Sequence, residues 1–343
     1  MRILVAGLYE WVVPITHNCA NALESLGCEV ERFDSDDPVS PIMIILMRIA
    51  KSFAKIIGMK QNLSAYFNQI KYKKRLRRFL DSVDRFNPDV ILVIRLNHYD
   101  VVTMKRMQEK GINTICWMIE PKSIDVVMKD MPGYDHYYSM HRSHQSVGAK
   151  YLPVFAYDPD NFFPSDKIIK KIPLLFVGHW SARRQEWLES LVCLSSSISI
   201  IGYHWRKKLG GGHPLYGSVK EDGVDLRSLR YWYQSAQIVI NINRLDTSNA
   251  GGGNLRLADV PACKTVLLSE YSDDLREHFD LDIDIAVFYN KKELLDKCRK
   301  LLANQNLRND IEQAGFTKVH SIGTYQDRMM KILRDVGYCQ SQA

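Results

Sequence analysis

The stretch "QIVININRLDTSNAGGGNLRLADVPACKTVLLS", residues 237–269, changes character three times along its length. It opens with an apolar run typical of a buried strand, passes through a polar loop with three glycines, and continues as a helix before a second apolar run. Units of this kind build parallel sheets, in which ligands bind at the carboxyl ends of the strands. The loop is therefore a candidate ligand site.

The loop and the helix after it combine several features of a phosphate site. Glycines let backbone amides approach a ligand, and an Asn at a helix start can act as its N-cap. The positive helix end would face the ligand, and an acid one turn inside the helix can accept both hydroxyls of a ribose. The alternative is a mobile surface loop with an Arg–Asp surface pair. The candidate binding residues of this stretch are Asn243, Arg244, Gly251, Gly252, Gly253, Asn254, Arg256 and Asp259.

An earlier strand, "PLLFVG", also ends in a glycine, Gly178, and leads into a helix expected at residues 181–194. Arg183 and Arg184 stand at the start of that helix, where guanidinium groups and free helix amides suit a diphosphate. The alternative is a solvated helix face, because arginines are common at strand ends in α/β folds.

The next strand, "SISIIG", is followed by the aromatic residues Tyr203, His204 and Trp205. These residues could form a wall for a base or a sugar, and the alternative is an aromatic loop that packs inward. Residues 203–224 as a whole are expected to form a glycine-rich loop region.

The same α/β alternation runs through the chain in two blocks. The first block opens with the strand "RILVAG" and a helix, without a GxGxxG motif, and the second restarts after the polar stretch "DPDNFFPSDK". The sequence therefore predicts an α/β protein with two doubly wound, Rossmann-like domains that face a cleft. We expect the first domain at residues 1–162 and the second at 170–323.

Positive charge is concentrated in one segment of the first domain. The net charge of the chain is +7, whereas residues 48–85 alone hold eleven basic and two acidic side chains, a net +9. Such local basicity favours a docking surface and indicates no nucleic-acid partner. The pattern predicts a basic helical insertion at about 40–85, whose part at 42–78 could rest on an anionic membrane surface. The alternative is a helical subdomain whose apolar face packs on the sheet.

The cysteines and the N-terminus indicate a cellular compartment. Seven cysteines are scattered without a CxxC pair, which predicts reduced thiols in a cytosolic protein rather than disulfides or a zinc site. The N-terminus runs straight into a strand-like segment, so we expect no signal peptide. No apolar run approaches the ~20 residues that span a bilayer. We therefore expect a cytoplasmic protein.

Several of these segments occur together in one known family. From about Lys171 to Leu333 they are "FVG" followed by an Arg, "IIG", "SAQIVININR", "RLADVPAC" and the closing segment "KKELLDKCRKLLANQNLRNDIEQAGFTKVHSIGTYQDRMMKIL". In this combination the second half resembles the C-terminal domain of GT-B fold glycosyltransferases, especially CgeB-like spore-maturation proteins and bacterial group 1 glycosyl transferases. The first half resembles the family more weakly, through "CWMIEP" and "LPVFAYDPDNFFP".

The resemblance implies a metal-independent glycosyltransferase that moves a sugar from a nucleotide-sugar donor to a glycan or lipid-linked acceptor, in bacterial surface polysaccharide or lipopolysaccharide synthesis. It also implies that a C-terminal helix at 324–343 crosses back to the first domain. The family usually has Phe-Glu where this chain has Ala258 and Asp259, and many retaining members carry an acid at the place of Gly251. The missing acid favours inversion. The alternatives are a nucleotide-sugar-binding protein without turnover and a membrane-attached scaffold.

An inverting enzyme of this fold needs a carboxylate or a histidine as general base. Glu120 stands at the place of the family's usual acid, and Glu10 follows the first strand, where inverting members often place their base. Ordinary loop polarity is the alternative for both residues. The candidates on the acceptor side are His17, Arg95 and His98.

We expect neither a metal ion nor another cofactor. His204 has no second histidine or acid at the spacing of a metal site. Asp282 and Asp284 have the DxD spacing that holds a metal in GT-A glycosyltransferases, but so short a motif is expected to arise by chance.

Overall fold

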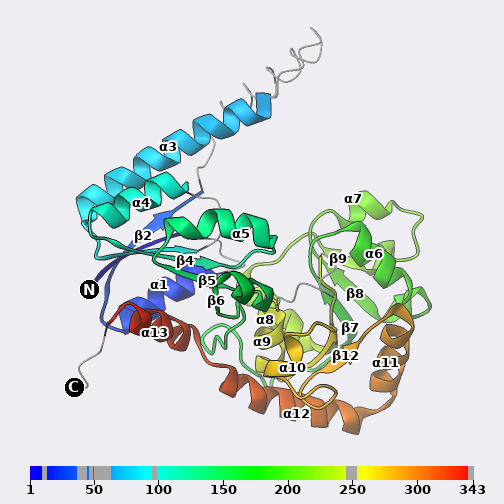
Figure 1. Ribbon diagram of the computed structural model, residues 1–343. Coiled ribbons are helices and arrows are strands. Elements are labelled where there is room, and N and C mark those ends of the chain that lie inside the picture. The colour runs from blue at the N-terminus through cyan, green and yellow to red at the C-terminus, as the bar shows by residue number, and fades with distance from the viewer. Residues whose placement is uncertain are drawn as a thin grey trace. The chain divides into compact units, whose positions relative to one another are not determined.

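The computed structural model describes residues 1–9, 14–36, 45, 49, 63–94, 99–244 and 253–338. The chain divides into two compact units, of which the first comprises Met1–Glu10, Pro14–Tyr138 and Leu333–Ala343, and the second Trp11–Val13 and Ser139–Ile332. The chain forms two six-stranded sheets, one mainly in each unit, with helices on their faces (Figure 1). The predicted α/β class with two doubly wound sheets is confirmed.

The first sheet has the strand order β2-β1-β3-β4-β5-β6, and β1 pairs in parallel with both β2 and β3. Helix α1 covers one face of this sheet, and α3, α4 and α5 lie on the other (Figure 1). The elements are β1 (Arg2–Gly7), α1 (Ile15–Ser25), β2 (Glu29–Asp34), α3 (Leu63–Phe86), β3 (Val90–Ile94), α4 (Val101–Glu109), β4 (Asn113–Met118), α5 (Ile124–Asp130), β5 (His136–Ser139) and β6 (Lys150–Tyr151).

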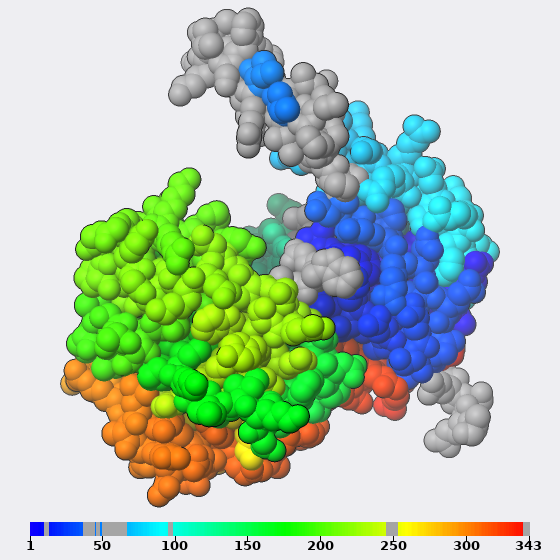
Figure 2. Space-filling view, turned by 180° about the vertical axis from the view of Figure 1, so that it is seen from behind, coloured from blue at the N-terminus to red at the C-terminus, as the bar shows by residue number. Residues whose placement is uncertain are grey.

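Helix α3 is amphipathic, with an apolar face that packs inside the first unit and a basic face that is exposed. Phe79 is fully buried, and its ring lies 5.6 Å from that of Phe33 in β2. Lys73, Lys74 and Arg77 lie on the exposed side, and side chains of α3 form part of the molecular surface (cyan in Figure 2). This part of the basic insertion therefore packs its apolar face inward, as the second interpretation predicted. Most of the insertion before α3 lies outside the described residues.

The second sheet is parallel throughout, with the strand order β12-β11-β10-β7-β8-β9. Its strands are β7 (Ile172–Val177), β8 (Ile198–Ile201), β9 (Val219–Glu221), β10 (Ala236–Asn241), β11 (Val266–Glu270) and β12 (Ala286–Phe288). Its helices are α6 (Ala182–Glu189), α7 (Trp205–Leu209), α8 (Leu226–Ser235), α9 (Arg256–Ala262), α10 (Leu275–His278), α11 (Lys291–Ala303) and α12 (Gln305–Ile322). The helix α13 (Tyr325–Asp335) has residues in both units.

The middle of the second sheet fixes where a ligand can bind. In β10, Val239 is fully buried and pairs with Leu175 of β7 and Leu267 of β11. The chain runs from β7 outward to β8 and β9, and then returns to β10 on the other side of β7. Strand order therefore reverses between β7 and β10. In an open α/β sheet, the crevice at the carboxyl ends of such a strand pair is the usual ligand site.

Two details of the second unit differ from the sequence prediction. Residues 203–224, expected as a loop region, contain α7 and the edge strand β9. The predicted helix at 181–194 ends at Glu189 and is followed by a 3-10 helix, Val192–Ser197. Further 3-10 turns are Met131–Gly133, Arg142–Val147 and Tyr216–Ser218.

Candidate functional site

Two glycines let the ends of β7 and β8 come together. A Cβ on Gly202, after β8, would lie 2.1 Å from the carbonyl oxygen of Gly178, after β7, and Gly202 has a φ of +145°. A Cβ on Gly178 would lie 2.9 Å from Arg184 Nη1 and 3.1 Å from Arg256 Nη2. At Gly202 the close neighbour is backbone, so only glycine tolerates the approach there. The predicted strand-end glycine Gly178 therefore lies directly under two guanidinium groups.

Trp205 does not form the exposed wall that the sequence suggested. The side chain is fully buried, and its ring centroid lies 5.7 Å from that of Phe176 in β7. Its indole Nε1 donates to the carbonyl oxygen of Gly178 at 2.8 Å. An indole that finds a hydrogen-bond partner is well suited to burial, so Trp205 holds the end of β7 instead of facing a ligand.

Arg184 is a buried cation that supports the strand ends. The residue is 8% exposed, and its guanidinium donates to the carbonyl oxygens of Ile242 and His179 at 3.1 and 3.0 Å. Burial, reinforced by the neighbouring Arg256, Arg244 and Arg183, lowers the pKa of Arg184 to about 9. Like charges held together at the end of a sheet favour a bound anion, which would relieve their repulsion.

Arg256 is fixed by a network of amides at the start of α9. Its guanidinium donates to Asn241 Oδ1 at 3.0 Å and to the carbonyl oxygen of Val177 at 2.5 Å. Asn254 Nδ2 donates to the side-chain oxygens of Asn241 and Asn243 at 3.0 and 3.1 Å. Helix α9 begins at Arg256, so its N-cap is one residue later than predicted, although Asn254 Oδ1 still accepts from the Arg256 amide at 3.1 Å.

Arg183 is neutralised by Glu270 at the end of β11. The guanidinium donates to both carboxylate oxygens, and one of its nitrogens also donates to the carbonyl oxygen of Asn243 at 3.1 Å. The amide of Asn243 donates to Glu270 Oε2 at 3.0 Å. The sequence interpretation missed Glu270, whose only signal is an acid that directly follows an apolar strand.

The remaining candidates near these strands are exposed. Arg244 and His204 lie at the surface, and Tyr203 is 50% exposed. His204 has a φ of +75° and is the N-cap of α7. The ring of Tyr203 lies 5.1 Å from that of His179, an exposed residue that the sequence interpretation also missed. His179 directly follows Gly178, and that position is the signal that could have found it.

Residues 183–334 match the family model described as "Glycosyl transferase-like". This part of the chain is therefore similar to glycosyl transferases, and it is called the glycosyl transferase-like domain below. The match begins at Arg183 and spans β10, α9 and β11, so it includes all four arginines described above. No curated protein sequence matches the chain.

Solved structures resemble the whole chain at low sequence identity. Sucrose-phosphate synthase from Thermosynechococcus elongatus has 11% identity and a TM-score of 0.72, with 98% of this chain and 99% of that chain covered. A glycosyltransferase from Rickettsia africae has 12% identity and a TM-score of 0.67, with coverage of 100% and 99%. HepE from Anabaena in complex with UDP has 10% identity and a TM-score of 0.64, with coverage of 98% and 100%. The chain therefore has the GT-B fold, as its sequence predicted.

Two predicted residues of the glycosyl transferase-like domain are buried. Asp259 is 7% exposed, and burial together with the nearby Asp158 raises its pKa well above the usual value, against the opposing effect of Arg256. Gly253 is buried against Phe155, whose ring a Cβ would approach to 2.4 Å. This environment of Asp259 differs from the open helix end that the sequence predicted for a ribose contact.

The candidates of the first unit are only partly described. Glu120 follows β4, and its carboxylate lies 3.3 Å from Lys122 Nζ, with 34% of its side chain exposed. His17 lies on α1, 4.8 Å from the ring of Tyr9. The other candidates lie outside the described residues, in this unit Glu10, Arg95 and His98, and in the glycosyl transferase-like domain Gly251 and Gly252.

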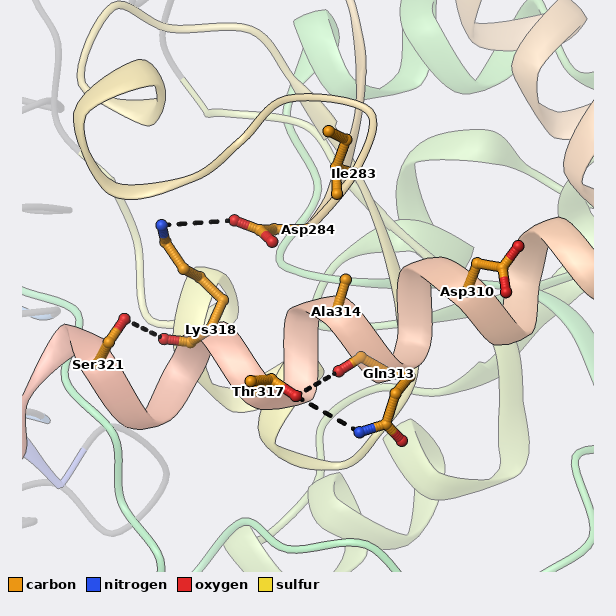
Figure 3. Close-up of a pocket in the computed structure, with 8 residues that line it drawn as sticks. All are labelled: Ile283, Asp284, Asp310, Gln313, Ala314, Thr317, Lys318 and Ser321. Carbon is orange, nitrogen blue, oxygen red and sulfur yellow. Dashed lines mark hydrogen bonds and ion pairs between the residues drawn. The ribbon is translucent and has the colours of Figure 1, made fainter.

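The DxD acids belong to a turn over α12. Asp284 accepts a hydrogen bond from the amide of Asp280 at 2.8 Å and lies 3.7 Å from Lys318 Nζ (Figure 3). Asp282 accepts from the amide of Val287 at 3.1 Å. The open hollow beside this turn has a volume of about 670 Å³ and is lined largely by one side of α12. Across the residues that the structure describes, no three His, Cys, Asp or Glu side chains are grouped so that they could hold a metal ion.

Proposed function

We propose that the chain is a glycosyltransferase that moves a sugar from a nucleoside-diphosphate donor to a glycan or glycolipid acceptor. The observation that carries the proposal is the arginine cluster, which we define as Arg183, Arg184, Arg244 and Arg256. Among the described residues, Glu270 forms an ion pair with the first of these residues. The others stand at the reversal point of a parallel sheet, where donors bind in open α/β folds. The match to the glycosyl transferase-like family and the UDP in the HepE structure support this assignment.

The proposed chemistry needs two kinds of group. Negative charge develops on the departing diphosphate, and guanidinium groups that are already in place stabilise it without reorganisation. In this proposal they take the role that a metal ion has in other transferases. Glu120 is the proposed general base for the acceptor hydroxyl, because it follows β4 and remains partly exposed. A single displacement of this kind inverts the anomeric centre.

A thermal-shift panel tests the donor assignment. The chain is heated with UDP, GDP, ADP, CDP, dTDP and CMP, and at least one nucleotide is expected to stabilise it, by about 2.7 kcal/mol at 100 times its Kd. Arg244→Ala is expected to weaken that binding about tenfold, since a hydrogen bond to a charged group contributes roughly 1.5 kcal/mol. Lys292→Ala, an equally exposed change on α11, serves as the control. A panel without any stabilising nucleotide would contradict both an enzyme and a nucleotide-sugar-binding protein.

A turnover assay distinguishes a glycosyltransferase from a nucleotide-sugar-binding protein and from a membrane-attached scaffold. The nucleotide sugar that corresponds to the best nucleotide is incubated with the chain and with glycans of the bacterial cell envelope. Release of nucleotide that depends on the glycan supports transfer, whereas tight binding without release supports a binding protein. A scaffold would show neither effect.

We also propose a cytoplasmic location at the inner face of the cell membrane, where lipopolysaccharide and surface polysaccharide precursors are assembled. The support is the local charge of residues 42–78 and the exposed basic side of α3. No helix among the described residues is long and apolar enough to span a bilayer. Attachment would therefore use the surface, where each basic side chain near anionic lipid contributes about 1 kcal/mol.

Liposome flotation tests the membrane surface. The wild-type chain is expected to float with vesicles that contain anionic lipid. With vesicles of neutral lipid alone, it is expected to remain unbound at the bottom of the gradient. Lys73→Glu with Lys74→Glu should lower the bound fraction at least tenfold, because it reverses two charges. The matched control, Lys292→Glu with Lys300→Glu, changes net charge equally on the exposed side of α11 and should bind like the wild type. Equal loss in both variants would point to net charge rather than to α3.

A further inference from the structure

His179 is the first side chain after the glycine that ends β7. Its carbonyl oxygen accepts a hydrogen bond from Arg184 Nη1 at 3.0 Å, which fixes the backbone at this point. Its imidazole meets the ring of Tyr203 edge to face, with an interplanar angle of 79°. The side chain is exposed, so a ligand at the carboxyl ends of β7 and β10 can reach it.

Cations act on the imidazole of His179 from several elements. Partial burial, together with Arg184, His204, Arg244 and Arg256, lowers the pKa of His179. Glu270 already accepts from Arg183 and from the amide of Asn243. The groups that act on the imidazole or contact it come from α6, the start of α7, the end of β10 and the start of α9, and they are Arg184, Tyr203, His204, Arg244 and Arg256. The acids Glu221 and Asp222 stand at the end of β9, where Gly223 adjoins the ring of Tyr203.

When no anion is bound, the surrounding cations keep the imidazole of His179 neutral. A further permanent cation here would add to the repulsion among the arginines whenever the site is empty. A titratable group adds its positive charge only when an anion is present to balance it. The position of His179 is therefore suited to a group that changes charge with ligand binding.

We propose that His179 contacts the donor diphosphate and takes up one proton from solvent as that anion binds. The inference rests on the proposed function, since it needs an anion at the arginine cluster. The neutral imidazole becomes an imidazolium with two N–H donors, and it returns the proton to solvent when the diphosphate leaves. Donor binding would thus be coupled to pH through a single side chain, and affinity would fall as the pH rises.

NMR of the imidazole signals tests the proposal with sulfate, an anion whose own charge is constant between about pH 5 and 8, where histidines titrate. The signal of His179 is assigned by its absence in His179→Gln. Sulfate is expected to raise its titration midpoint by about one pH unit or more, which corresponds to a tenfold change in affinity. His213, which lies 3.1 Å from Glu189, serves as the internal control and should not move.

The outcomes separate this inference from the proposed function. If sulfate binds but the titration midpoint of His179 does not change, the proposed proton uptake is wrong, whereas the proposed anion site at the arginine cluster stands. If sulfate binds nowhere near the arginine cluster, the anion site is wrong and the inference fails with it. As a second measurement, wild-type affinity for sulfate should fall about tenfold from about pH 5 to 8, and His179→Gln should lose most of that dependence.

Discussion

Arg256→Leu is expected to weaken binding of the best nucleoside diphosphate about 100-fold. Its guanidinium is held by Asn241 and Val177 at the carboxyl ends of β10 and β7, so it meets a ligand without rearrangement. Two charge-assisted hydrogen bonds at roughly 1.5 kcal/mol each give about 3 kcal/mol, which is the expected loss in affinity. Calorimetric titration of both proteins with the same nucleotide measures it.

The substitution Arg230→Leu is a matched control that shows whether the loss of affinity in Arg256→Leu could come from misfolding. Arg230 also binds a backbone carbonyl, that of Asn161 at 3.2 Å, and stacks 4.2 Å above the ring of Phe163. It lies on α8, so Arg230→Leu should leave nucleotide affinity unchanged. Arg256→Lys keeps the charge but cannot reproduce the planar fork, and about a tenfold loss is expected. Unchanged affinity in Arg256→Leu would place the diphosphate elsewhere.

The strand ends that form the candidate donor site could be predicted from the sequence, because glycine and arginine follow short apolar runs there. Gly178, Arg183 and Arg244 each stand directly after or near such a run, and parallel strands bring their carboxyl ends to one edge. Strand order could not be predicted in the same way. Glu270 lies 87 residues from Arg183, and only the place of β11 beside β10 brings the two together.

The burial of individual side chains also could not be predicted from the sequence pattern. Trp205 follows a strand-end glycine as a ligand wall would, yet the pattern does not reveal that Phe176 of β7 lies beneath it. Arg256 and Asp259 share a helical spacing, but Asp158, far away in the sequence, lies close enough to affect the carboxyl of Asp259. Such neighbours come from tertiary packing, which local periodicity does not encode.

The strand β9 shows a third limit. It has only three residues, Val219–Glu221, and follows a glycine-rich stretch, so composition predicted a loop. Its strand character comes from pairing with β8, where Val219 lies opposite Ile200. Short edge strands depend on the partner more than on their own propensity. The strand β9 was therefore missed, whereas β7, β8, β10 and β11 were predicted from their apolar runs.

Glu270→Gln is expected to lower the free energy of unfolding by about 2–3 kcal/mol. The carboxylate is 8% exposed and is the only acid that the structure shows accepting from Arg183. Its loss leaves a largely buried guanidinium beside Arg184, and removal of one partner from a buried pair costs roughly 3–5 kcal/mol when nothing replaces it. The glutamine oxygen can still accept from the amide of Asn243, which reduces the expected loss. Urea denaturation in a buffer without multivalent anions measures it.

Sulfate should restore more stability to Glu270→Gln than to the wild type. In the variant the carboxylate that the structure shows paired with Arg183 is lost, so an anion relieves more repulsion within the arginine cluster and binds more tightly. Glu186→Gln is the matched control, because Glu186 pairs with Lys291 at the surface, where ion pairs contribute at most about 1 kcal/mol. Equal gains from sulfate in Glu270→Gln and the wild type would mean that Arg183 does not face the anion. The arginine cluster would then consist of three residues, and Glu270 would serve only to join β11 to α6.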